Sequence, residues 1–345
     1  MKKLLAVLLL AALLLPSFAM AQEVVNVFNC EDYIADEVLD LFEKETGIKV
    51  NYMNYTGNED MLVSLYANPG AYDVVFPSEY CVERLLASGD LSEINYDNIP
   101  NAQYVLPSLR DPSYDPGNAH SVPYMWGTVG LLYNKKLTGG EITSWESLFD
   151  PQYKGNVFMM DSVRDTIGVG LAASGYSMNS VTESELYTAR DLLIKQKKDG
   201  MVKAYLVDET KDMMVGGEAA IALVWSGDAL YAMEKNDDLA YCVPVEGSNI
   251  WVDAMCIPKA SEKKEAAQVF IDFMCRPEIA FKNQQYIYYS TPVQAVADTM
   301  YSEEEKANLT LNPTQDIIDR CEFFKDVSEY NDLYEAVWMN VKQAQ

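Results

Sequence analysis

Five short segments of the sequence place carboxylates next to aromatic or polar side chains at the ends of apolar stretches. They are NCEDY at 29–33, PSEY at 77–80, MDSVRD at 160–165, VWSGD at 224–228 and WVD at 251–253. In open α/β sheets a ligand binds outside the carboxyl ends of the strands, where the loops converge. These five segments are therefore the candidate binding residues, and their shared chemistry is that of carboxylates beside aromatic rings.

Asp253 is the most informative of these carboxylates, because the rest of NIWVDAM (249–255) has the composition of a strand that enters a core. Burial of a lone carboxylate is costly unless a partner compensates its charge. Asp253 therefore either points to solvent or awaits a positively charged partner. The segment alone leaves both alternatives open.

Several common kinds of enzyme site are missing from the sequence. The single histidine, His120, lies in a loop rich in Pro, Gly and Asp, which argues against histidine-rich zinc sites and a Ser-His-Asp triad. The glycine motifs that bind phosphates and dinucleotides and the nucleophile-elbow motif are also lacking. We therefore expect no enzymatic activity and no cofactor. Tyr288 and Tyr289 leave ferric iron open as a ligand, although neighbouring tyrosines more often belong to a core or its rim.

The elements that would position these groups alternate between strands and helices. EVVNVFN alternates like a strand, IADEVLDLFEKETG has helical spacing that ends at Gly47, and IKVNYMNY is again typical of a strand. The rhythm restarts at GNVFMMD (155–161). Strands that alternate with helices of this length predict sheets with parallel strands and helices on both faces, here in two α/β lobes.

Residues 1–21 have the order of a secretory signal peptide, with two lysines, an apolar run and the small-residue ending AMA. We expect cleavage after this segment and a soluble, periplasmic protein. The remaining 324 residues exceed the usual size of one core, which favours two lobes. The net charge of −26 argues against a nucleic-acid partner. An acidic surface attracts cationic ligands, although solubility alone also explains it.

Nearly the whole mature chain resembles, in the order and spacing of its motifs, the spermidine/putrescine-binding periplasmic proteins of ABC transporters. The motifs are FNCEDYI, FEKETGIKV, AYDVVFPSEY, SVPYMWGTVGLLYN, TSWESLFDPQYKGNV, AIALVWSGD, NIWVDAMCIPK, FIDFMCRPEIA and YYSTP. Blocks such as FEKETGIKV recur among extracellular solute-binding proteins in general. The polyamine assignment rests on fewer positions.

The resemblance implies the type II periplasmic-binding-protein fold, in which two α/β lobes joined by a hinge close on a ligand in the cleft between them. It implies a first lobe of residues 22–128 with 254–298 and a second lobe of residues 129–253 with 299–345. The implied function is that of a monomeric receptor that binds putrescine or spermidine and delivers it to a membrane permease. Another cationic solute or ferric iron is the alternative in the same class. A secreted hydrolase is the alternative from a different class.

In the family, the polyamine lies between aromatic faces and its ammonium groups are held by carboxylates. The strongest match is the W-x-D of Trp251 and Asp253. The ligand-binding residues that the resemblance implies are Asp32, Tyr33, Ser78, Tyr80, Asp165, Trp225, Trp251, Asp253 and Tyr289. Taken singly, the two tryptophans are also compatible with a core, and Asp165 with a helix N-cap.

Three positions depart from the family pattern. Cys30 stands where the first loop commonly has tryptophan, Ser162 where some spermidine binders have aspartate, and Phe324 near a polar residue of their tail. One carboxylate fewer favours putrescine over a ligand with three nitrogens. Glu31 and Glu79, which neighbour predicted site residues, are expected to be solvated.

Overall fold

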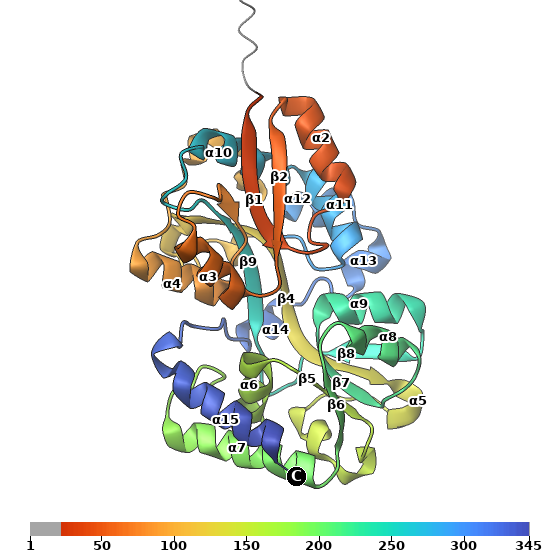
Figure 1. The fold of residues 1–345 in the computed structure, drawn as a ribbon. Helices are drawn as coiled ribbons and strands as arrows, with labels where there is room; N and C mark the ends of the chain where they lie inside the picture. Colours follow the sequence, from red (N-terminus) through yellow and green to blue (C-terminus); the bar gives the residue numbers. More distant parts are fainter. Residues whose placement is uncertain (1–21, 345) are drawn as a thin grey trace, which may run out of the picture.

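A computed structural model describes residues 22–344, so the predicted signal peptide at 1–21 lies outside the described residues. The chain forms two lobes stacked along one axis (Figure 1). The described chain begins at the far end of the first lobe and finishes at the far end of the second. Among residues 22–344, no helix combines the length and the apolar character needed to cross a membrane.

The first lobe is built on the strand order β2-β1-β3-β9-β4. β1 (Val24–Cys30) pairs in parallel with β2 (Lys49–Tyr55) and β3 (Val74–Val75), and β9 (Ile250–Cys256) joins β3 antiparallel. The helices of this lobe are α2 (Asp36–Thr46), α3 (Asn58–Ala67), α4 (Glu79–Ser88), α10 (Lys264–Met274) and α11 (Pro277–Ile287). Gly47 caps α2 in a left-handed conformation, which confirms the predicted end of that helix.

The second lobe continues the sheet in the order β4-β7-β5-β6, with β8 on β4. Its strands are β5 (Val157–Met160), β6 (Val202–Leu206), β7 (Ile221–Trp225) and β8 (Leu239–Cys242). Its helices are α5 (Lys135–Thr138), α6 (Val163–Ala173), α7 (Glu183–Lys198), α8 (Glu209–Val215), α9 (Ser226–Lys235) and α15 (Asn331–Gln343). Parallel pairing of β5 with β6 and β7 confirms the second α/β lobe.

β4 (Ser121–Asn134) is the long strand that links the lobes, and all of its residues are buried (Figure 1). Its residues 121–128 pair with β9, whereas its residues 129–133 pair with β7 and its residues 131–134 with β8. The strand therefore leaves the first sheet and enters the second between Thr128 and Val129. The largest buried apolar cluster also continues through both lobes, from Phe42 in α2 to Leu193 in α7.

The C-terminal segment contacts both lobes before it ends. Tyr301 and Leu311 pack with Val293 and Val296 of the first lobe, whereas α15 packs on α6 and α7 of the second. Three short helices lie between α11 and α15: α12 (Gln294–Thr299), α13 (Glu303–Ala307) and α14 (Gln315–Asp319). The prediction of a two-lobe fold is confirmed. The exact lobe boundaries stay a proposal, and this packing favours a crossing of the tail later than residue 299.

Short 3-10 helices fill the longer connections. They are η2 (Tyr96–Asn98), η3 (Pro100–Tyr104), η4 (Pro107–Leu109), η5 (Pro116–Asn118), η6 (Trp145–Phe149), η7 (Pro151–Tyr153) and η8 (Ser328–Tyr330). The first four lie on the path from α4 to β4. Ile99, Val105 and Leu109 are buried along this path, so the long connection is packed against the first lobe.

Glu79, the first residue of α4, joins three chain segments where the lobes meet. It is 1% exposed, and its carboxylate accepts the backbone N–H groups of Val252 in β9 at 3.1 Å and of Phe324 in the tail at 3.2 Å. Burial raises the pKa of Glu79 to about 8, and the two N–H bonds oppose part of that rise. The expectation of a solvated Glu79 is therefore wrong, whereas Glu31 is exposed as expected.

We expect the melting temperature of the wild type to fall relative to that of Glu79→Gln as the pH rises from roughly 5 to 8. A glutamate in the unfolded chain releases its proton near pH 4.5, whereas folded Glu79 holds it up to about pH 8. Within this window the folded state binds more protons, so stability decreases with rising pH. Thermal melts of both proteins, followed by circular dichroism across this range, measure the difference. A difference that stays constant with pH would contradict the raised pKa.

Candidate functional site

Asp253 lies in β9 and its carboxylate is bonded by two hydroxyl groups of the first lobe. The Tyr33 hydroxyl donates to Oδ2 at 2.6 Å and the Ser78 hydroxyl donates to Oδ1 at 2.6 Å. Tyr33 follows β1, and Ser78 forms an antiparallel bridge with Asp253 just before α4. Burial raises the pKa of Asp253, and the two hydroxyls oppose part of the rise. Both partners are neutral, so they solvate the carboxylate without balancing its charge.

Aromatic rings surround this carboxylate. Trp251 and Tyr289 meet edge to face with ring centroids 4.8 Å apart, and Tyr289 lies 6.1 Å from Tyr33. Tyr124 supports Tyr33, because the Tyr124 hydroxyl donates to the backbone oxygen of Tyr33 at 2.6 Å. The indole nitrogen of Trp251 is buried and has no hydrogen-bond partner. The aromatic rings thus form apolar walls beside the carboxylate of Asp253.

The second lobe contributes Asp165 and Trp225. Asp165 is 6% exposed, lies in the first turn of α6 and accepts the hydroxyl of Ser162. Burial raises the pKa of Asp165, whereas Ser162, Arg164 and the indole of Trp225 at the end of β7 favour its charged form. Ser162 is the residue that caps α6, so the interpretation of Asp165 as the N-cap is wrong. Contact of Asp165 with a ligand stays a prediction.

Asp228 is a candidate site residue that lies in one of the five segments, but the sequence analysis did not single it out there. It lies in the first turn of α9, where Oδ2 accepts the Tyr289 hydroxyl at 3.4 Å and Oδ1 is 3.3 Å from the Lys211 Nζ. Burial raises the pKa of Asp228, and Lys211 opposes the rise. The available signal was VWSGD, which puts a carboxylate one helical turn after Trp225.

Two predicted residues lie apart from Asp253. Asp32 is exposed, has a left-handed φ of 52° and accepts the hydroxyl of Tyr286 at 3.4 Å. Tyr80 is half-buried and donates its hydroxyl to Glu59 of α3 at 3.1 Å. Both residues come from the first lobe. Their contact with a ligand stays a prediction.

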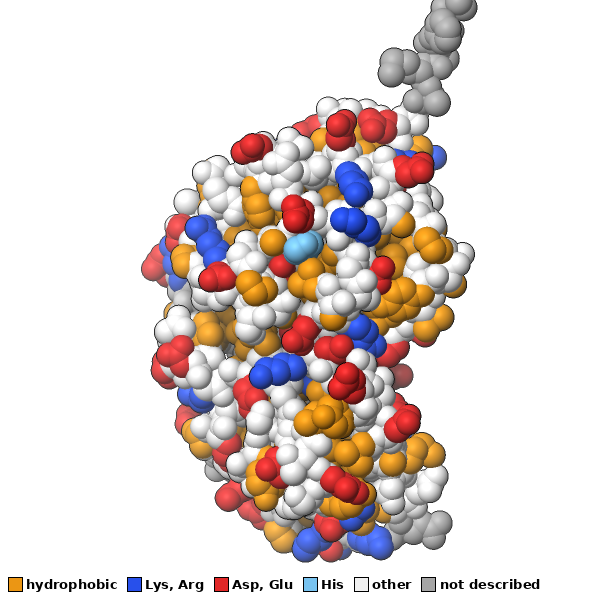
Figure 2. Space-filling model, turned by 90° about the vertical axis from the view of Figure 1, so that its left-hand side faces the viewer, with side chains coloured by type: hydrophobic (Ala, Val, Ile, Leu, Met, Phe, Trp, Pro, Cys, Tyr) orange, Lys and Arg blue, Asp and Glu red, His pale blue; other side chains and the backbone are white. Residues whose placement is uncertain are grey.

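The two lobes face each other with acidic groups. Burial raises the pKa values of Asp228, Tyr289 and Cys30, and the exposed Asp208, which precedes α8, adds a smaller part of the rise in each case. Figure 2 shows that the surface narrows between the lobes and that acidic side chains gather there, with a few basic ones among them. This field favours a cation at the junction.

Tyr288 and Tyr289, the two residues on which the ferric-iron alternative rests, contact different side chains. Tyr288 has a φ of 71° and its ring meets Tyr231 of α9 at 5.5 Å, whereas Tyr289 meets Trp251 at 4.8 Å. Within residues 22–344, no three or more His, Cys, Asp or Glu side chains are arranged to hold a metal ion.

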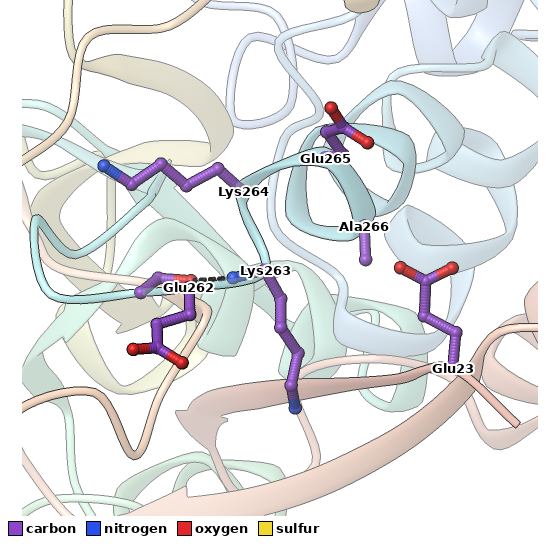
Figure 3. A pocket seen from close by; sticks show the side chains of 7 residues that line it. Glu23, Glu262, Lys263, Lys264, Glu265 and Ala266 are labelled. Carbon is purple, nitrogen blue, oxygen red and sulfur yellow. Dashed lines mark hydrogen bonds between the residues drawn. The ribbon is translucent and has the colours of Figure 1, made fainter. Parts of the chain in front are cut away.

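A separate open pocket lies at the other end of the first lobe. It has a volume of about 400 Å³ and is lined by Glu23 and residues 261–266 (Figure 3). Glu23 precedes β1, whereas the residues around Asp253 follow the opposite end of that strand, so the pocket is remote from them. Lys263 lies 3.5 Å from the buried carboxylate of Asp73, which explains this lysine as a structural partner.

The two-lobe fold is that of solute-binding proteins, and the comparisons agree. The family model of the bacterial extracellular solute-binding protein matches residues 37–312. The chain therefore belongs to the bacterial extracellular solute-binding protein family.

Relatives with assigned names cover almost the whole chain. The spermidine/putrescine-binding periplasmic protein of Salmonella typhimurium is 32% identical over 317 residues, which are 91% of this chain and 90% of the relative. The putrescine-binding periplasmic protein of Pseudomonas aeruginosa is 29% identical and covers 94% of this chain and 93% of its own.

A solved structure shows the same fold. The spermidine/putrescine ABC transporter substrate-binding protein of Streptococcus pneumoniae superposes with a TM-score of 0.82 at 33% identity and covers 92% of this chain and 99% of its own. The resemblance inferred from the motifs is confirmed.

We expect Gly227→Ala to destabilise the protein by about 1–3 kcal/mol, the usual cost of overpacking. A methyl group at Gly227 would lie 2.1 Å from a ring carbon of Tyr289, so the ring would have to move. Urea denaturation measures the loss. Gly140→Ala is the matched control, because a methyl group there meets nothing within 4 Å. Equal stability of both variants would show that Tyr289 does not need this close approach.

Proposed function

We propose that this chain is the periplasmic receptor of an ABC importer and that it binds the polyamines putrescine or spermidine. The observation that carries the proposal is the carboxylate of Asp253, which has two neutral hydroxyl partners and aromatic neighbours. A site built in this way lacks one positive charge, and an ammonium group supplies it. The names of the relatives support the same class of ligand.

The physical chemistry of a polyamine suits these walls. An ammonium group that donates to a carboxylate contributes roughly 1.5–3 kcal/mol per charge-assisted bond. The face of an aromatic ring adds about 0.5–2 kcal/mol for a cation held against it. The methylene segments between the nitrogens prefer apolar rings to water. A chain of methylenes with charged ends therefore matches a row of rings with carboxylates along it.

The proposed ligand-binding residues come from both lobes. They are Asp32, Tyr33, Ser78, Tyr80, Asp165, Trp225, Trp251, Asp253 and Tyr289. The burial of Asp165 and the partners of Asp253 support the inner members of this set. Asp228 lies beside Tyr289 but is already paired with Lys211. Asp32 and Tyr80 belong to its rim.

Binding would couple to lobe closure. In the proposed mechanism the two lobes open around β4, β9 and the tail. The closed form gains stability because only this form brings Asp253, which is bonded by Tyr33 and Ser78 of the first lobe, and Asp165 of the second lobe to one cation chain. The receptor acts as a monomer, carries out no reaction, needs no cofactor and passes its ligand to a membrane permease. Cleavage of residues 1–21 would release it into the periplasm.

The test is calorimetric titration of the protein with putrescine and with spermidine, after unfolding and refolding to remove bound ligand. We expect micromolar or tighter binding that weakens with added salt, because the contacts are charged. A protein that gives neither heat nor a shift in melting temperature with either amine would refute the polyamine proposal. A coloured complex with ferric iron would favour the iron alternative instead.

We expect Asp253→Asn to weaken binding of either amine by at least about 2 kcal/mol, roughly thirtyfold, because a desolvated ammonium group loses its counter-charge. The asparagine keeps the size of the side chain and one oxygen acceptor, so the change isolates the charge. Asp97→Asn is the matched control, since Asp97 is exposed on the first lobe. Equal affinity of the two variants would remove Asp253 from the site while leaving the receptor function open.

A further inference from the structure

Lys211 of α8 pairs with one of the site's carboxylates. Its Nζ lies 3.3 Å from Oδ1 of Asp228, and the two side chains are 30% and 14% exposed. The other oxygen of Asp228 accepts the hydroxyl of Tyr289 at 3.4 Å. Lys211 also lies 5.7 Å from the ring of Tyr231. The ammonium group of the protein thus occupies the position beside Asp228 that an ammonium group of a ligand would otherwise take.

The contacts between side chains give the order of the site residues, starting from Lys211. Asp228 contacts Tyr289, whose ring meets Trp251 and Tyr33, and Tyr33 donates to Asp253. Lys211 therefore stands at one end of a row of alternating carboxylates and rings. A ligand that extends past Tyr289 toward Asp228 would approach a resident positive charge.

Asp253 and Asp165, two other carboxylates of the proposed site, are bonded differently. Asp253 and Asp165 accept hydroxyl groups, from Tyr33 and Ser78 in one case and from Ser162 in the other. Arg164 is the neighbour of Asp165, but its guanidinium donates to the backbone oxygen of Lys325 at 3.0 Å and to Asn179 at 3.2 Å. It also stacks 4.5 Å from the ring of Phe324. Two carboxylates are thus left with neutral partners.

We propose that Lys211 is a specificity-determining residue, which limits the ligand to two ammonium groups by pairing with Asp228 and leaving Asp253 and Asp165 to the ligand. This inference rests on the proposed function. It selects diamines over triamines among the polyamines. A triamine placed in the same row would have to displace Lys211 or leave its third ammonium group next to a like charge, and both alternatives cost affinity.

The experiment compares putrescine and spermidine binding to the wild type and to Lys211→Met by calorimetry. We expect the wild type to bind putrescine more tightly. In Lys211→Met the affinity for spermidine should rise about tenfold relative to that for putrescine, as expected for one charge-assisted bond to the freed Asp228. Lys203→Met is the matched control, because Lys203 lies in β6 of the same lobe and donates to the backbone oxygen of Glu218. This control should leave the ratio of the two affinities unchanged.

A double variant tests whether the effect of Lys211 on spermidine affinity depends on Asp228. Adding Asp228→Asn to Lys211→Met should abolish the gain in spermidine affinity, because the carboxylate that accepts the third ammonium group is gone. Lys211→Gln removes the charge but keeps a donor to Asp228, so it replaces Lys211→Met if circular dichroism shows that the methionine variant is unfolded. An unchanged affinity ratio in the folded variant, or a gain that survives Asp228→Asn, overturns the role of Lys211. Failure of the wild type to bind either amine refutes the proposed function instead.

Discussion

The organisation of the site depends on the cost of burying the carboxylate of Asp253 without a cation. Hydroxyl donors reduce that cost, and Tyr33 and Ser78 each give one hydrogen bond of 2.6 Å. They cannot cancel the charge, so the protein keeps an acidic group whose pKa is raised by burial. A binding protein gains from this arrangement because the missing charge arrives with the ligand. Free energy that a structural ion pair would use for folding is then available for recognition.

This site requires two lobes that meet in a defined way, and the crossing strands provide the contact. β4 and β9 pair from Ser121 with Cys256 to Thr128 with Ile250, so Asp253 lies on the strand pair that approaches the second lobe. Gly227 lets the ring of Tyr289 approach the start of α9, and Glu79 joins β9 to the tail. Close packing at these points favours a few discrete arrangements of the lobes over a continuous range.

Much of the fold and part of the site follow from local sequence patterns. Alternating strands and helices predicted two α/β lobes, and the carboxyl ends of the strands marked the segments around Tyr33, Asp165 and Trp225. Asp253 was expected at a strand end but lies in the middle of β9. The failures concern side chains whose surroundings come from distant segments. Glu79 is buried because the backbone of Phe324, 245 residues later, covers it, and no local pattern contains that contact. Asp228 was overlooked because its importance depends on Tyr289, 61 residues away.

The carboxylates that are available to a ligand therefore depend on which of them are already paired with a cation of the protein, and not on the composition alone. The net charge of −26 and the number of acidic residues near the junction do not distinguish a carboxylate that is free from one that is already paired. Asp228 and Asp253 are chemically identical side chains, but one has an ammonium partner at 3.3 Å and the other has two neutral hydroxyls. Two receptors with the same carboxylates can thus prefer ligands of different charge if one of them carries a lysine at the end of the row. Specificity is set by the charge that remains after the protein's own cations have paired with the site.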